Sequence, residues 1–244
     1  MVQNLIRNIG IETMELHGLS KNGLERVLSF EGYGNKAADY WFLGIEEGGG
    51  SIEQLRLRAK FYDVVEDLDT AHRKIGLRDE MLKSPTLKVM SKLSLALLGR
   101  PNWSEKSAVD EFHATELGRS GEDTFLTELM PLPCPNIKAW PYESICSTKE
   151  VCTAMVRPGR IRWLRSEIEK FQPAFVICYG KMNWRFHQEI FSDVEFRPQL
   201  DDSIRVGKHG HSTVLLIPFL SYDLTTTTLI KQISELLGDG QNSQ

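Results

Sequence analysis

Two adjacent carboxylates, Glu46 and Glu47, stand in a segment that holds four glycines, residues 44–50. The apolar run at 40–43 precedes this segment and is typical of a buried strand. Ser51 follows it and can cap a helix, in which apolar residues recur every three or four positions. A glycine-rich loop between a strand and a helix lets the backbone approach a ligand and turns a carboxylate toward it. The alternative is a plain turn with two solvated acids.

Other kinds of site are not indicated. The segment has no lysine after its glycines and lacks the Gly-x-Gly-x-x-Gly spacing. It therefore matches neither the phosphate-binding nor the dinucleotide-binding motif, which makes a nucleotide-driven enzyme a less favoured function. The four cysteines form no Cys-x-x-Cys pair and are expected to be free thiols. His209 and His211 flank a glycine, but no acid stands at ligand spacing from them. We therefore expect neither a metal nor any other cofactor.

The segments that must position the two carboxylates alternate between strand-like and helix-like sequence patterns. Strands are predicted at 40–43, 124–130, 174–179 and 213–217, and helices after 51, after 84, after 159, around 184–191 and at 224–237. This alternation indicates a parallel sheet between two layers of helices, a three-layer α/β/α sandwich. Prolines at 131, 133 and 135 predict that the chain leaves the sheet there. Ligands of such sheets bind outside the carboxyl ends of the strands.

Length and composition indicate one globular domain. The chain has 244 residues, of which 41% are hydrophobic and 25% charged, which excludes disordered and fibrous classes. No apolar run reaches the roughly 18 residues of a membrane span, and the first residues lack the pattern of a secretory signal. We expect a cytoplasmic protein that does not bind membranes.

The net charge of −4 argues against coating nucleic acid through charge alone. Between 149 and 165, however, five lysines and arginines stand against a single acid, Glu150. Lys181 and Arg185 extend this basic stretch beyond the third predicted strand. It is either a modest phosphate-contacting face or an ordinary solvated helix surface.

The order of these elements resembles the uracil-DNA glycosylase superfamily over residues 38–237, as a divergent member. The resemblance rests on the segments 41–48, 125–133, 162–180 and 214–218, the last of them before the final helix. It implies a single domain whose four-stranded parallel sheet has the order 2-1-3-4, with residues 1–37 as a helical or loop extension. It also implies a monomer that binds DNA and flips one damaged or deaminated base. Such enzymes then hydrolyse the N-glycosidic bond without a metal.

The resemblance assigns roles to residues of the first half of the site. Glu46 falls on the place that positions water, and Glu47 replaces a proline, so both are candidate catalytic residues. Candidates for binding the base are Gly44, Ile45, Tyr62 and Asn136. Asn136 follows a proline, however, and the alternative is that it is an ordinary turn residue.

The second half of the site departs from the family pattern. The family's last motif is His-Pro-Ser after the fourth strand, and here Pro218 matches the proline. Ile217 stands in the histidine place and cannot donate a hydrogen bond. Candidates for contacting DNA are Pro218, Phe219, Leu220 and Ser221 together with Arg160, Arg162, Arg165 and Lys181. The alternative for Phe219 and Leu220 is packing against the final helix.

Three functions therefore remain open. The first is a glycosylase of the kind described, with Glu46 holding the water. The second is a catalytically inactive protein of the same fold that binds nucleic acid, a nucleobase or a protein partner. The third is a metal-dependent hydrolase.

Overall fold

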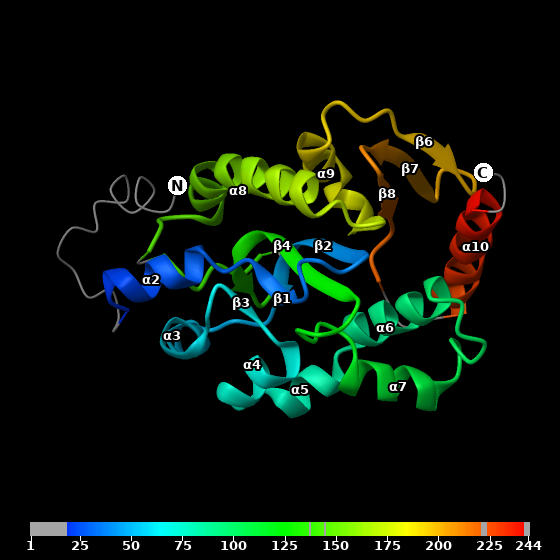
Figure 1. Cartoon of the computed structure of the whole chain (residues 1–244). Helices are drawn as coiled ribbons and strands as arrows, with labels where there is room; N and C mark the ends of the chain where they lie inside the picture. The colour runs from blue at the N-terminus through cyan, green and yellow to red at the C-terminus, as the bar shows by residue number, and fades with distance from the viewer. Residues whose placement is uncertain (1–18, 137, 144, 221–223, 242–244) are drawn as a thin grey trace.

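The computed structural model describes residues 19–136, 138–143, 145–220 and 224–241 (Figure 1). Its centre is a mixed sheet of eight strands in the order β3-β1-β4-β2-β5-β8-β7-β6. The strands are β1 (Gly32–Gly34), β2 (Tyr40–Gly48), β3 (Val65–Glu66), β4 (Thr124–Cys134), β5 (Phe175–Tyr179), β6 (Arg197–Gln199), β7 (Ile204–His209) and β8 (Ser212–Ile217). The α/β class is confirmed, but the expectation of a four-stranded, wholly parallel sheet is wrong.

The four predicted strands are the central ones, β4, β2, β5 and β8, and each is parallel to its neighbour. By their order in the chain they lie as 2-1-3-4. The four additional strands extend both edges: β1 pairs antiparallel with β4, and β7 antiparallel with β8. Because β1 lies within residues 1–37, that segment contributes a strand to the sheet, which corrects the expected helical or loop extension.

Helices cover both faces of the sheet. They are α2 (Lys21–Leu28), α3 (Ile52–Phe61), α4 (Leu68–Lys74), α5 (Arg78–Lys83), α6 (Pro85–Leu97), α7 (Lys106–Thr115), α8 (Lys149–Phe171), α9 (Trp184–Ile190) and α10 (Leu224–Gln241), with a 3-10 turn, η1 (Lys181–Asn183). Figure 1 shows α8 and α9 on one side of the sheet and α4 to α7 on the other. Among the described residues, no helix is long and apolar enough to cross a membrane.

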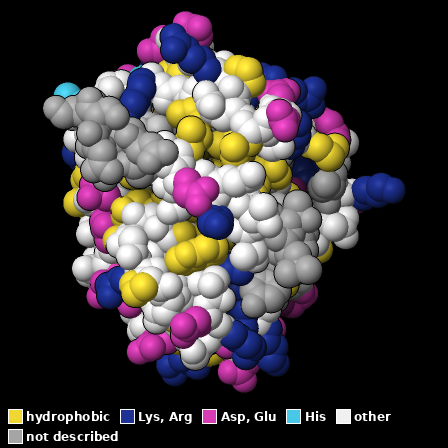
Figure 2. Space-filling model, turned by 90° about the vertical axis from the view of Figure 1, so that its right-hand side faces the viewer, with side chains coloured by type: hydrophobic (Ala, Val, Ile, Leu, Met, Phe, Trp, Pro, Cys, Tyr) yellow, Lys and Arg dark blue, Asp and Glu magenta, His cyan; other side chains and the backbone are white. Residues whose placement is uncertain are grey.

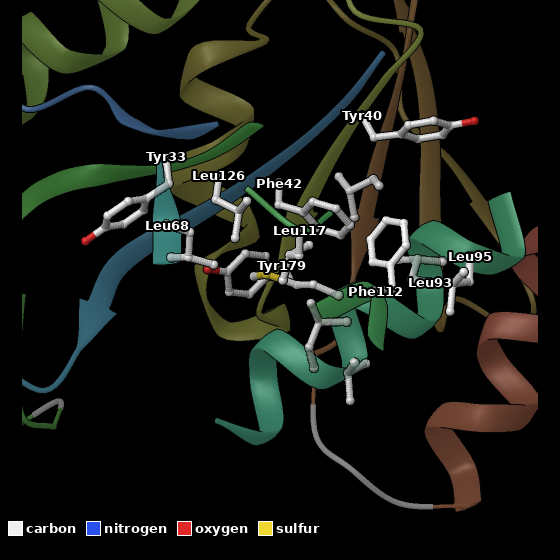
Figure 3. Close-up of a cluster of buried hydrophobic side chains, with 14 of the residues drawn as sticks. Tyr33, Tyr40, Phe42, Leu68, Leu93, Leu95, Phe112, Leu117, Leu126 and Tyr179 are labelled. Carbon is white, nitrogen blue, oxygen red and sulfur yellow. The ribbon is translucent and has the colours of Figure 1, made fainter. Parts of the chain in front are cut away.

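Alternate residues of β2 enter different cores. Trp41 and Leu43 pack against Leu164 and Ile168 of α8, whereas Phe42 lies in the core that α6, α7 and α10 cover (Figure 3). All three residues of 41–43 are fully buried, as expected of a strand covered on both faces. The carboxyl end of β2 is therefore held from both sides.

Prolines 131 and 133 do not end the second predicted strand, which continues to Cys134. Beyond Leu126 the only described strand that pairs with β4 is β2, at Glu46 and Gly48 among others. The other edge of β4 therefore needs no backbone donor there, and prolines are tolerated on such an edge. The expected exit from the sheet at 131 is corrected to 134.

Helix α8 begins at Lys149, eleven residues before the predicted start at 160, and includes the exposed Pro158 in its interior. Thr148 caps it by accepting a hydrogen bond from the backbone N–H of Val151. Pro158 has no N–H to give the carbonyl of Ala154 four residues earlier, which weakens the helix at that point.

We expect Pro158→Ala to raise the free energy of unfolding by about 1–3 kcal/mol, because it restores one backbone hydrogen bond at an exposed helical position. Urea unfolding followed by circular dichroism measures the change. Ser166→Ala, at another exposed position of α8, is the control and changes stability by no more than about 0.5 kcal/mol. Equal or lower stability of Pro158→Ala would show that the proline is required by the packing of α8.

Candidate active site

Two carboxylates, Glu46 and Glu47, lie near the carboxyl end of β2, and a third, Glu128, lies within the adjacent strand β4. Gly44 of β2 is paired with Glu128 of β4, and Glu46 with Met130 two residues further along. The register between the two strands shifts between Glu46 and Gly48. At this irregularity the two adjacent carboxylates of β2 reach different helices, α8 and α3.

Glu47 is bound on both oxygens. Arg58 of α3 donates from Nη1 to Oε2 at 2.6 Å and from Nη2 to Oε1 at 2.8 Å, and Tyr33 Oη donates to Oε2 at 3.0 Å. His72 Nε2 lies 3.7 Å from Oε1. Burial raises the pKa of Glu47, but the charge and hydrogen bonds of Arg58, aided by His72, outweigh it and hold that pKa well below its usual range. Glu47 thus stays ionised and fastens α3 and β1 to β2, which revises its expected catalytic role.

Glu46 is held more loosely. Lys149, the first residue of α8, donates from Nζ to its Oε1 at 2.5 Å. The side chains of the two residues are 16% and 22% exposed, so solvent reaches the pair. Among the described residues, no hydrogen bond reaches Oε2 of Glu46. A carboxylate oriented through one oxygen and open at the other is suited to holding a water molecule.

Glu128 belongs to one row of residues that crosses the central strands. Gly44 is paired with Glu128 on one side, Leu43 is paired with Cys178 on the other, and Tyr179 is paired with Ile217. The row therefore runs Glu128, Gly44, Tyr179, Ile217. Tyr179 Oη donates to Glu128 Oε1 at 2.7 Å, above the strand that separates them.

Gly44 makes this hydrogen bond possible. A Cβ at position 44 would clash with Glu128 Oε2 and with Tyr179 Oη. Tyr179 itself is buried in the core that Figure 3 shows, next to Leu68 and Phe42. The two side chains therefore fill the space above Gly44 that the sequence interpretation assigned to a base.

Glu128 carries its proton at neutral pH. Burial is the largest cause, and together with the charges of Glu47 and Glu46 it raises the pKa of Glu128 to about 8. The hydrogen bond from Tyr179 and the charge of Arg160 act in the opposite direction. Oε2 of Glu128 is buried and has no hydrogen-bond partner among the described residues.

The other residues predicted to bind a base make contacts within the protein itself. Ile45 packs against the core beneath α8. Tyr62 is buried, with its ring 5.3 Å from the guanidinium carbon of Arg58. Asn136 Oδ1 accepts hydrogen bonds from the backbone N–H groups of Lys138 and Ala139, both at 3.0 Å. Asn136 thus closes a turn, as the alternative interpretation expected.

Arg160 was expected on a DNA-contacting surface but is 3% exposed. It donates to the backbone carbonyls of Phe30 at 3.0 Å and Glu128 at 2.7 Å. An arginine that satisfies buried carbonyls is not available to phosphates, so this expectation is corrected.

The rest of the basic stretch is largely paired with acids. Arg165 lies 2.8 Å from Asp193, and Arg157 lies 3.5 Å from Glu189. Lys181 donates to the backbone carbonyl of Asp202 at 3.0 Å. Arg162 is exposed and makes no ion pair with a described residue. Figure 2 shows lysines and arginines beside aspartates and glutamates over the face it presents, without a field of one sign.

The segment after β8 ends in a partly exposed aromatic residue. Phe219 is 60% exposed, and its ring lies 6.4 Å from that of Tyr179, edge to face. Leu220 is buried among the residues of the core, and Ile217 is 1% exposed. Ser221 lies outside the described residues.

Sequence reasoning did not identify Glu128, Tyr179, Arg58, Tyr33 and His72 as site residues. Glu128 did carry a signal, since it is the sole charged residue in the otherwise uncharged strand 124–134. Arg58 carried another, because it stands three positions after Leu55 on the apolar face of the predicted helix. Tyr33 and His72 had no such signal.

Neither a protein-family model nor a curated protein sequence matches this chain.

We expect Gly44→Ala to lower the free energy of unfolding by about 1–3 kcal/mol, because the new methyl group displaces Glu128 or Tyr179. Urea unfolding measures the loss. Gly48→Ala in the same strand is the matched control, since nothing lies within 4 Å of the position its Cβ would take. An equal effect of the two substitutions would contradict the close packing above Gly44.

Removing one partner of the Glu47–Arg58 pair leaves the other charge uncompensated. We expect Glu47→Gln and Arg58→Met each to cost about 3 kcal/mol, and the double variant to cost clearly less than the sum. Because the folded-state pKa of Glu47 is lowered, its contribution is present above about pH 4.3, the usual pKa of glutamate, and is lost as the pH falls below it. Urea unfolding at pH 7 and pH 3 should thus show a smaller cost of Glu47→Gln at pH 3. Additive costs would contradict the pairing.

Proposed function

We propose that the protein is a DNA N-glycosylase, a divergent relative of the uracil-DNA glycosylase superfamily that acts on a damaged or deaminated base. The observation that carries this proposal is Glu46, a carboxylate near the carboxyl end of a central strand. Lys149 holds one of its oxygens, and no described residue makes a hydrogen bond to the other. The order of the four central parallel strands is the one that the resemblance implies. The exposed Phe219 offers a face on which a base or its neighbour stacks.

In this proposal Glu46 acts on water. Its Oε2 accepts a hydrogen bond from a water molecule, which attacks C1′ of the deoxyribose as the bond to the base breaks. The carboxylate takes the proton that the water loses, and its negative charge stabilises the positive charge that develops on the sugar. Lys149 fixes the orientation of the carboxylate through Oε1.

The test is strand breakage at a defined base. Labelled oligonucleotides, single- and double-stranded, carry one uracil, one hypoxanthine or one thymine opposite guanine, and are heated in alkali after incubation with the full chain. We expect breaks with at least one of them, and a rate about 10²–10⁴-fold lower for Glu46→Gln. Glu53→Gln, an acid of the neighbouring α3, is the control and leaves the rate unchanged. Background breakage with every substrate, or equal rates for wild type and Glu46→Gln, would refute the proposal.

A second candidate is a protein of the same fold that binds nucleic acid or a nucleobase without cleaving it. Ile217 favours it, because a buried isoleucine gives no hydrogen bond at the place where the family has its histidine. It predicts salt-dependent binding of the same oligonucleotides with no product. Fluorescence anisotropy at two salt concentrations, run beside the breakage assay, separates the two functions.

A further inference from the structure

A primary amine lies against the carboxylate that holds the water in the proposed reaction. Lys149 Nζ donates to Glu46 Oε1 at 2.5 Å. The side chains of Lys149 and Glu46 are 22% and 16% exposed, so a molecule in solution reaches both of them, whereas Oε2 of Glu128 is fully buried. Lys149 also contacts the thiol of the buried Cys134. The amine is therefore held in place and remains accessible.

The amine and the water of the proposed reaction belong to the two oxygens of one carboxylate. Lys149 Nζ lies on Oε1, and the water is assigned to Oε2. A lysine side chain is flexible and ends in a compact group, so rotations within its stem move Nζ toward an atom beside the water. A sugar carbon that comes within reach of this water therefore also comes within reach of the amine.

The surroundings of Lys149 favour its use as a nucleophile. A lysine attacks a carbonyl carbon as the neutral amine, so its ammonium group must first give a proton to an acceptor. The Glu46 carboxylate is such an acceptor, already in hydrogen-bond contact with Nζ. Lys149 is also the first residue of α8, a helix of 23 residues, and the positive end of a helix dipole disfavours a further positive charge.

We propose that Lys149 gives the protein a second activity, cleavage of the DNA strand at the abasic sugar that removal of a base leaves. This inference rests on the proposed function, which produces that sugar. An abasic deoxyribose opens to an aldehyde at C1′, and a primary amine condenses with an aldehyde to form an imine. The substrate of the second activity is thus a deoxyribose aldehyde within a DNA strand.

The reaction needs no reactant other than water. Nζ of Lys149 forms a bond to C1′, and the aldehyde oxygen leaves as water, so that a protonated imine remains. Glu46 takes a proton from C2′, the electron pair of that bond forms a C2′–C3′ double bond, and the C3′–O bond breaks with its electron pair going to the phosphate. Water then hydrolyses the imine, which restores the amine and releases an unsaturated aldehyde. Glu46 returns its proton to solvent.

The test uses an oligonucleotide with one preformed abasic site, so that it does not depend on removal of a base. The oligonucleotide is incubated with the full chain and sodium borohydride, which reduces the imine to a stable amine linkage. We expect a covalent protein–DNA adduct on a denaturing gel, and strand cleavage without alkali when borohydride is left out. Peptide mapping by mass spectrometry should place the adduct on Lys149.

Lys149→Arg separates the reacting amine from its charge. Arginine keeps a positive charge beside Glu46, but its guanidinium group does not form an imine. We expect a loss of about tenfold or more in both the adduct and the cleavage without alkali. Lys138→Met removes an exposed lysine from the segment before α8 and is the control, which leaves both quantities unchanged.

The outcomes distinguish failure of this inference from failure of the proposed function. No adduct with wild type, an adduct mapped to another amine, or an equal amount of adduct with Lys149→Arg would overturn the inference. If substrates with an intact base then still break in alkali, the glycosylase stands and only the second activity is lost. An adduct on Lys149 without release of any base refutes the glycosylase instead. Because peptide mapping uses the wild type, it decides even if Lys149→Arg does not fold.

Discussion

The hydrogen bond from Tyr179 to Glu128 passes over a strand, and it exists because residue 44 of that strand has no side chain. It joins β4 to β5 above β2, at the level where the fully buried part of β2 ends. Beyond this level β2 changes register against β4, and its two carboxylates turn toward different helices. The bond thus lies between the fully buried residues of β2 and its two carboxylates.

Three glutamates lie within this small region, and their surroundings give each a different state. Glu47 is ionised and paired with Arg58, and this ion pair holds α3 against β2. Glu46 is paired with Lys149 through one oxygen, and no described residue makes a hydrogen bond to the other. Glu128 is buried beside two negative charges and holds its proton. Burial and neighbouring charge, which decide these differences, are properties of the tertiary structure and not of the residue type.

The sequence predicted the elements that have strong local patterns. The apolar runs of β2, β5 and β8 and the capped, periodic helix α6 lie where they were expected. The expected loop at 44–50 is corrected, because β2 continues to Gly48 and Glu46 and Glu47 lie within the strand. Strands β1 and β3 have three and two residues, too few for any periodicity to show. The end of β4 was predicted too early, at prolines 131 and 133. A proline interrupts a strand only where the edge that lacks its N–H would pair with another strand.

Of the site, the sequence predicted the acidic segment with Glu46 and Glu47 but not the contacts that distinguish these two residues. Arg58, Glu128 and Tyr179 come from three other elements, and only the sheet register brings them to the end of β2. The buried Arg160 looked like a surface residue because helical spacing alone does not tell which arginine faces the sheet. The neutral state of Glu128 at pH 7 is measured directly by carboxyl ¹³C NMR of the wild-type protein, with the resonance assigned by Glu128→Gln. We expect a titration midpoint near pH 8, and a midpoint at the usual glutamate value of about 4.3 would contradict a neutral Glu128.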